Sequence, residues 1–166
     1  MGDSSSSSAM AAAARRWLEA IDAKSADPAV ATDAAWRGGF FDALALSGIR
    51  VSLAERGRAS CSFRVPAHLT DGEGRWQPGP MATAMDDVGA AAIMSEEGII
   101  KVSVAFDISF FNPAMFNEEV EFDARVVDRK GMLTAVVVEI RKKGDGRLVA
   151  VGRQWMSSTR PLKSKL

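Results

Sequence analysis

Apolar side chains alternate with polar or small ones along four stretches of the chain, which is the period of a β-strand with one buried face, and glycine turns precede two further strand-like stretches. Arg56-Gly57 separates the first two stretches and predicts a β-hairpin, and Gly144-Asp145-Gly146 predicts another tight turn between the last two. Gly131 marks a further turn, so the last four stretches predict an antiparallel meander. The six stretches are residues 49–53, 59–65, 102–110, 119–126, 132–142 and 147–157.

A long segment, 81–95, separates the hairpin from the meander and is apolar around nearly its whole circumference when it is read as a helix. Pro80 suits the first position of such a helix, where its missing N–H costs nothing. A helix that is apolar on all sides is a buried helix. The order of hairpin, buried helix and four-stranded meander therefore predicts an α+β fold, in which a curled antiparallel sheet wraps around one long central helix.

The pattern divides the chain into one folded domain and two terminal extensions. Residues 1–33 form the first extension, in which Ser4–Ser8 is expected to be disordered and the alanine-rich segment 9–18 to be helical. The domain covers residues 34–158 and opens with a short amphipathic helix over 34–46. A chain of this length suits one compact domain with a full core.

The second extension, residues 159–166, ends in Ser164-Lys165-Leu166, the tripeptide that a peroxisomal import receptor reads at a free C-terminus. The residues just before it look extended and exposed, as such a receptor requires. We therefore expect import into the peroxisome through that receptor, with a cytoplasmic location as the alternative.

Composition narrows the chemistry that the domain can carry. Its 166 residues include 21 basic and 21 acidic side chains, and this balance argues against a general nucleic-acid binder. No apolar run is long enough to span a membrane. Cys61 and His68 are the only cysteine and histidine, so no metal site is expected and a Ser-His-Asp arrangement is nearly excluded. Catalysis would have to rest on carboxylates, amides, hydroxyls and backbone groups.

Asp86 and Asp87 are the only charged residues inside the predicted buried helix. A buried carboxylate is costly unless it is paired or used in chemistry. Adjacent helical residues point roughly 100° apart, so one of the two can face a site while the other faces elsewhere. The alternative is that one or both reach solvent or an arginine of a partner chain.

The segment Asp71–Ala90 resembles the active-site segment of the hotdog-fold acyl-CoA thioesterases, the group related to acyl-coenzyme A thioesterase 13 and to the phenylacetate-pathway thioesterases. In that family, Asn, five further residues and His-Gly-Gly precede a helix that carries Ala-Thr-x-x-Asp. The resemblance covers roughly residues 40–158. The matching motifs are Ala82-Thr83-Ala84-Met85-Asp86, Val102-Ser103-Val104, Asn112-Pro113-Ala114 and the spaced residues Leu148, Ala150, Gly152 and Arg153.

The resemblance implies hydrolysis of an acyl-CoA thioester to a free acid and CoA, with no cofactor beyond the CoA of the substrate. Asp86 would act as general base on water or attack the carbonyl as a nucleophile. Gln77 and Gly79 would polarise the carbonyl, and Asp71 would position the water from a facing subunit. Ser103, Pro78 and Asp87 would lie beside the substrate. Because family members form their sites at a subunit interface, we expect a homodimer or homotetramer.

Three residues depart from the family pattern: Gln77 stands in place of His, Asp71 in place of Asn, and Pro78 in place of the first Gly. Proline has no N–H to donate, and loss of one oxyanion donor costs about 3 to 4 kcal/mol of transition-state stabilisation. Gly79 and the amide of Gln77 can still donate. These departures leave a first alternative, a weakly active or non-catalytic protein that binds acyl-CoA or a related ligand.

Two further alternatives remain open at this point. The first is a hotdog dehydratase or hydratase, which usually carries an Asp/His pair, whereas His68 here lies nine residues before Gln77. The second treats residues 9–33 as an interaction arm.

Overall fold

The computed structural model describes residues 3–25 and 40–158. The first part of the helix expected over 34–46, the end of the proposed interaction arm and the C-terminal tripeptide lie outside the described residues. Within the described part, the elements follow one another in the predicted order. They are α1 (Asp3–Ser25), α2 (Phe40–Leu46), β1 (Arg50–Glu55), β2 (Arg58–Arg64), the 3-10 turn η3 (Ala67–Leu69), α3 (Pro78–Glu97), β3 (Val102–Phe110), β4 (Glu119–Lys130), β5 (Leu133–Lys142) and β6 (Leu148–Ser157).

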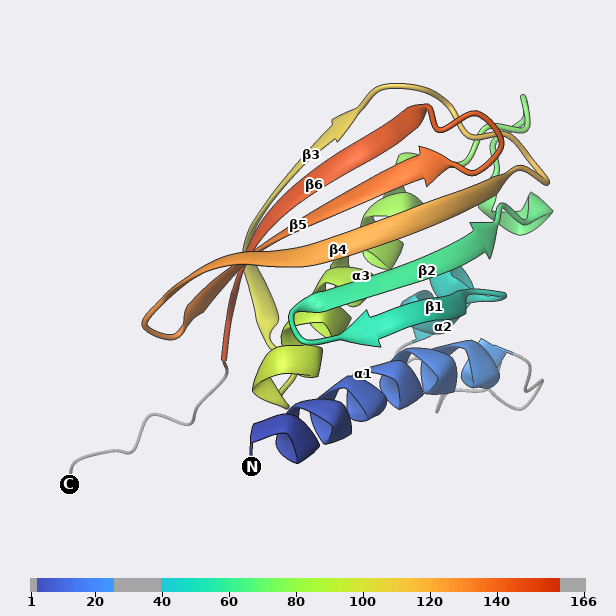
Figure 1. Cartoon of the computed structure of the whole chain (residues 1–166). Helices are drawn as coiled ribbons and strands as arrows, with labels where there is room; N and C mark the ends of the chain where they lie inside the picture. Colours follow the sequence, from blue (N-terminus) through green and yellow to red (C-terminus); the bar gives the residue numbers. More distant parts are fainter. Residues whose placement is uncertain (1–2, 26–39, 159–166) are drawn as a thin grey trace.

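The six strands form one antiparallel sheet in the order β1-β2-β4-β5-β6-β3, and the sheet curls around α3 (Figure 1). This arrangement confirms the α+β hotdog architecture expected from the sequence. β4 runs four residues further than its alternation predicted, to Lys130. The register against β5 shifts between Val126 and Asp128, and such an irregularity interrupts the two-residue period that reveals a strand.

The core lies between α3 and the inner face of the sheet. Met85, Val88 and Ala91 of α3 are fully buried, as the apolar circumference of that helix predicts. Burial of a large side chain such as Met85 contributes about 1.5 to 3 kcal/mol to folding. Three aromatic rings close one end of the core, with the centroids of Phe63 and Trp76 5.3 Å apart and those of Trp76 and Phe122 6.0 Å apart.

α1 differs from the prediction, because the helix begins at Asp3 and includes the serine run Ser4–Ser8 that was expected to be disordered. Leu18 and Ala14 are fully buried, and the Arg15 guanidinium donates from Nη1 to the carbonyl oxygen of Val51 at 2.8 Å. A helix already nucleated by packed residues extends at little cost, so serines can continue it without a core of their own. Among residues 3–25 and 40–158, no helix combines the length and apolar character needed to cross a membrane.

β3 is an edge strand, since only β6 pairs with it. Val102 and Val104 on this strand are 49% and 56% exposed. An edge strand with uncovered apolar side chains and unpaired backbone groups is an available surface for another chain.

Candidate active site

The N-terminus of α3 is built from Gln77, Pro78 and Gly79. The helix begins at Pro78, three residues before its predicted start, with Gln77 as the N-cap residue. Gly79 is exposed and lies in the first turn, where backbone N–H groups have no partner within the helix. Its N–H therefore points along the positive end of the helix dipole and can bind a developing negative charge.

The side chain of Gln77 ties this helix end to the preceding turn. Its Nε2 donates to the carbonyl oxygen of Thr70 at 2.9 Å, and its backbone N–H donates to Leu69 at the same distance. One amide N–H of Gln77 is thus used to hold the loop, and the second is left for a ligand.

Asp71 holds the loop that leads into α3. Its Oδ1 accepts the backbone N–H of Glu73 at 3.0 Å and that of Arg75 at 2.9 Å, and its Oδ2 pairs with the Arg75 guanidinium at 2.9 Å. The backbone and side-chain hydrogen bonds from Arg75 lower the pKa of Asp71, so it is ionised at neutral pH. Within one chain, both of its oxygens are committed to this loop.

Asp86 lies half-buried on α3, two turns further along, and joins Ser103 of β3 in one cluster. The hydroxyl of Ser103 donates to Asp86 Oδ1 at 2.5 Å. Among the residues that the structure describes, none donates a hydrogen bond to the second carboxylate oxygen, Oδ2. That oxygen is the one available to a water molecule or a substrate.

Gln154 of β6 is a third member of the cluster that the sequence analysis missed. Its Nε2 donates to Asp86 Oδ1 at 2.6 Å and lies 3.2 Å from the Ser103 hydroxyl. Gln154 is 1% exposed, and its Oε1 is buried without a hydrogen-bond partner in the described part of the chain. The signal was present in the sequence, because Gln154 is a polar residue at an inward position between Gly152 and Met156.

Gly89 explains how a glutamine fits against the helix. A Cβ atom at position 89 would lie 2.5 Å from Gln154 Oε1, closer than real Cβ contacts allow. Gly89 follows Asp86 by three residues, so it lies on the same side of α3. The missing side chain gives the amide the space from which it reaches Asp86.

Asp87 faces a different environment from its neighbour. Burial raises the pKa of Asp87 to about 8, with further contributions from Asp42 on α2 and from Asp86. Its Oδ2 is buried and has no hydrogen-bond partner among the described residues. The two adjacent carboxylates thus have different surroundings. Asp86 is hydrogen-bonded to Ser103 and Gln154, whereas Asp87 is near enough to α2 for the charge of Asp42 to act on it.

A hollow of about 340 Å³ opens beside the N-terminus of α3. Its lining is mostly apolar and includes Pro78 and Met81 from the helix and Phe110 and Phe111 from the end of β3. Asp71 also lines it. The hollow therefore lies beside the first turn of α3 and can take an apolar group. Within the described residues, no cluster of three His, Cys, Asp or Glu is arranged to hold a metal ion.

Gly79 and Asp86 lie on the same face of α3 but not at the same point. Seven residues separate them, which corresponds to about 10 Å along the helix axis at 1.5 Å per residue. A nucleophile and the donors to a carbonyl oxygen must instead lie about 3 Å from the same carbonyl group. The two halves of the site cannot act on one carbonyl group within a single chain.

The chain is similar to known proteins both in sequence and in structure. Residues 78–149 match the family model of the thioesterase superfamily, a range that includes Gly79, Asp86 and Ser103. Acyl-coenzyme A thioesterase 13 of Mus musculus is 31% identical over 94 residues, or 56% of this chain and 67% of the mouse protein. The Homo sapiens protein of that name is 29% identical over 109 residues, or 65% of this chain and 78% of its own. The crystal structure of zebra fish thioesterase superfamily member 2 has a TM-score of 0.72 at 26% identity and covers 86% of this chain and 94% of its own.

Proposed function

The chain belongs to the hotdog-fold acyl-coenzyme A thioesterase family, and from this premise we propose that it hydrolyses acyl-CoA thioesters to a free acid and CoA. The observation that carries the proposal is the cluster around Asp86. Two donors, Ser103 and Gln154, hold one carboxylate oxygen and leave the other open. The open oxygen is the one that could take a proton from water or attack a carbonyl carbon.

In the proposed reaction, Asp86 takes a proton from water as the water oxygen bonds to the thioester carbonyl carbon. The carbonyl oxygen becomes negatively charged, and the N–H of Gly79 stabilises it at the N-terminus of α3. The C–S bond then breaks, CoA leaves as the thiolate, and the thiolate takes up the proton that Asp86 accepted from water, which restores the carboxylate. Direct attack by Asp86 on the carbonyl carbon would give the same products through an anhydride that water hydrolyses.

We propose that the working site is shared by two copies of the chain. The distance between Gly79 and Asp86 along α3 supports this, because a second helix could bring its own Gly79 close to the first chain's Asp86. The uncovered edge of β3, with Val102 and Val104 exposed beside Ser103, offers a surface on which two sheets could pair. A homodimer, or a homotetramer built from such dimers, follows from this arrangement.

The hollow beside the helix N-terminus is proposed as the place of the acyl group or the adjoining pantetheine. Pro78, Met81, Phe110 and Phe111 give it apolar walls, and its volume is in the range of small-ligand sites, roughly 300 to 1,000 Å³. Pro78 favours a second candidate function, acyl-CoA binding with little turnover, because its nitrogen cannot donate to the carbonyl oxygen.

The release of free CoA thiol from a panel of acyl-CoA substrates tests the proposal. The wild-type protein should release thiol, and Asp86→Asn should reduce kcat by about a hundred-fold or more, the order of general acid–base catalysis. Binding of acyl-CoA to Asp86→Asn, measured by calorimetry, should persist. Binding by the wild-type protein without thiol release would support the second candidate and contradict hydrolysis.

A further inference from the structure

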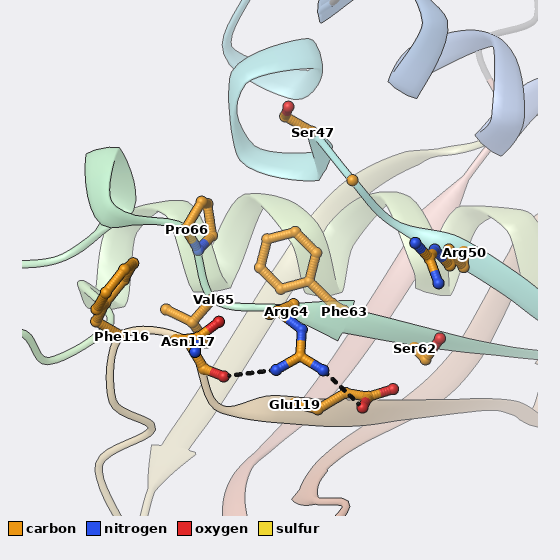
Figure 2. A pocket seen from close by; sticks show the side chains of 11 residues that line it. Ser47, Arg50, Ser62, Phe63, Arg64, Val65, Pro66, Phe116, Asn117 and Glu119 are labelled. Atoms are coloured by element: carbon orange, nitrogen blue, oxygen red, sulfur yellow. Dashed lines mark hydrogen bonds and ion pairs between the residues drawn. The ribbon is translucent and has the colours of Figure 1, made fainter.

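A second hollow, of about 400 Å³, lies where β1 begins, at the opposite sheet edge from β3 (Figure 2). It is enclosed by the turn after α2, the first residue of β1 and the ends of β2 and β4. The Phe63 ring lines it, and the same ring packs 5.3 Å from that of Trp76, which lines the hollow beside α3. The two hollows therefore lie on either side of one aromatic pair.

Arg50 supplies a positive charge to this hollow. It is exposed, and none of the hydrogen bonds or ion pairs among the described residues involves its guanidinium. Ser62 lies directly across from Arg50 in the β1–β2 register, so its hydroxyl is on the same side of the sheet. A planar guanidinium beside a hydroxyl matches the oxygens of a phosphate group.

The one carboxylate of the hollow is already neutralised. Glu119 pairs with Arg64 at 3.2 Å and with Lys143 at 2.8 Å, and the hydrogen bond from Lys143 is the largest influence lowering the Glu119 pKa. Arg64 also donates to the carbonyl oxygen of Asn117 at 2.9 Å. Three cations thus surround one carboxylate, and the surplus positive charge is that of Arg50.

An uncovered aromatic ring completes the hollow. Phe116 is 56% exposed and lies beside Pro66 at the end of the hollow away from Arg50 (Figure 2). Flat, apolar side chains of this kind stack against nucleic-acid bases. The lining therefore places a guanidinium and a hydroxyl at one end and an exposed aromatic ring at the other.

We propose that this hollow binds a phosphorylated adenine nucleotide, with a phosphate on Arg50 and Ser62 and the base against Phe116. Two sources supply this chemistry: the 3′-phosphoadenosine end of CoA and a free adenine nucleotide. The first source rests on the proposed thioesterase function, whereas nucleotide binding as such does not. The backbone N–H of Phe116 donates to Gly74 at 2.7 Å, so the loops that border the two hollows are joined.

Calorimetric titration with adenosine 3′,5′-bisphosphate tests the site without any thioester. The wild-type protein should bind it, and Arg50→Gln should weaken binding about ten-fold or more, the effect of losing one charge-assisted contact. Lys130→Gln is the matched control, because Lys130 is exposed at the far end of β4 from Glu119; its affinity should stay within about two-fold of the wild type. Adenosine, which lacks phosphate, should bind the wild type at least about ten-fold more weakly. No binding by the wild type, or equal losses in both variants, would overturn the proposal.

Kinetics with two substrates identify the source of the nucleotide. If the hollow takes the end of CoA, Arg50→Gln should raise KM for acyl-CoA and leave KM for the same acyl-pantetheine unchanged. If it takes a free nucleotide, Arg50→Gln should weaken 5′-AMP binding and leave both KM values unchanged. Asp86→Asn should retain nucleotide binding, so a failure of the thioesterase proposal would be distinguishable from a failure of this one.

Discussion

Gln154 Nε2 lies 2.6 Å from Asp86 Oδ1, although 68 residues separate the two in the chain. The amide and the Ser103 hydroxyl converge on the same carboxylate oxygen, so they fix the carboxylate plane and direct the other oxygen away from both donors. Gln154 itself is held by burial and by the space at Gly89. It is therefore a positioning residue, which would act on the reaction through Asp86.

Gln154→Met keeps the volume of the side chain and removes the donor. Since a hydrogen bond to a charged group contributes about 1.5 to 3 kcal/mol, kcat for thiol release should fall about 10- to 100-fold. KM for the same substrate should change little, because Gln154 contacts the carboxylate of Asp86 and acts on the reaction through it. Met156→Leu, a conservative change at the next inward position of β6, is the control. Equal losses of kcat in Gln154→Met and Met156→Leu would reduce Gln154 to a packing residue.

Asp87 makes stability depend on pH in a defined direction. Burial, with the charges of Asp42 and Asp86, raises its folded-state pKa from 3.8 to about 8. Between these values the folded chain retains a proton that the unfolded chain has released, so the stability present below about pH 4 is lost as pH rises toward 8. Asp87→Asn removes this loss. At about pH 8.5, urea denaturation should give the variant a free energy of unfolding about 2 kcal/mol or more above that of the wild type. At about pH 5 this difference should be smaller.

The same variant distinguishes the adjacent carboxylates in activity. Because Asp87 faces α2, Asp87→Asn should keep most of the thiol-release rate that Asp86→Asn loses. A comparable loss in both variants would show that position 87 contributes to the substrate site, as the family resemblance implies.

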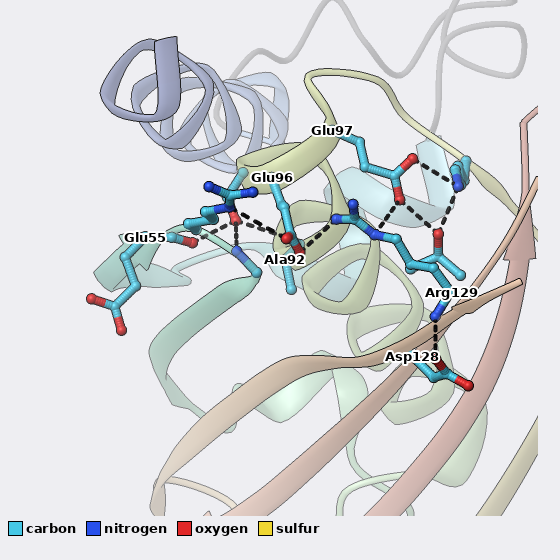
Figure 3. A network of polar contacts seen from close by, with 11 residues as sticks. Glu55, Ala92, Glu96, Glu97, Asp128 and Arg129 are labelled. Atoms are coloured by element: carbon cyan, nitrogen blue, oxygen red, sulfur yellow. Dashed lines mark hydrogen bonds and ion pairs between the residues drawn. The ribbon is translucent and has the colours of Figure 1, made fainter. Parts of the chain in front are cut away.

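Arg129 joins β4 to the C-terminal end of α3 (Figure 3). Its Nη2 lies 2.6 Å from Glu96 Oε2 and its Nε 3.4 Å from Glu97 Oε1. Arg129→Gln breaks both pairs, while Glu96 keeps its pair with Arg56 and Glu97 keeps its pair with Lys101. The variant should therefore lower the free energy of unfolding by about 1 kcal/mol at low salt. Arg147→Gln, which breaks the more exposed pair with Asp145, should change it by less than about 0.5 kcal/mol. Urea denaturation of the two variants measures the difference, and equal effects would contradict a special role for Arg129.

The fold could be predicted from the sequence because buried positions are apolar and recur at the period of each strand or helix. β2 and the first half of β4 bury every second residue, and α3 is buried on most of its surface. Alternation, turn residues and continuous apolarity therefore identified the strands, the long helix and their order. Ser103 could be placed near the substrate only through the family resemblance, since no local pattern shows which strand passes a given helical turn. Its hydrogen bond to Asp86 was not predicted.

Other features depend on contacts that no single segment encodes. Gln154 reaches Asp86 because β6 lies against α3 at Gly89, and this depends on the register of the whole sheet. The helical state of Ser4–Ser8 depends on the packing of α1 against the rest of the chain, whereas the serine run itself indicates disorder. Which of Asp86 and Asp87 faces the site depends on which side of α3 meets α2.

The uncovered edge of β3 predicts that two chains pair there. Val104→Asp places a charge on that edge, where pairing would desolvate it, so size-exclusion chromatography with light scattering should show a shift toward the monomer. Thiol release should fall in parallel, because each site needs both chains. Val127→Asp is the matched control, since Val127 is 57% exposed on β4, away from that edge. A dimer that survives Val104→Asp with full activity would contradict pairing through β3.

Pro78 tests how the carbonyl oxygen is bound. It occupies the first position of α3, where any other residue would present a free N–H at the positive end of the helix. Pro78→Gly adds that donor beside Gly79. If position 78 faces the developing oxyanion, kcat should rise about ten-fold or more, since one such donor is worth up to 10²–10³ in rate. The free energy of unfolding should fall by about 1 kcal/mol, because glycine gives the unfolded chain more conformational freedom.

Pro80→Gly separates the two effects. It carries the same entropic cost in the same turn, but its new N–H lies roughly 200° around the helix from position 78 and so lies on the far side of the helix from that oxygen. Pro80→Gly should therefore lower stability without raising kcat. Equal rate gains in both variants would indicate that loosening the turn, rather than an added donor, accelerates the reaction. If kcat does not rise in Pro78→Gly, position 78 does not face the oxyanion, and Gly79 is the donor that this turn supplies. Slow turnover of the wild type would then not be due to the proline.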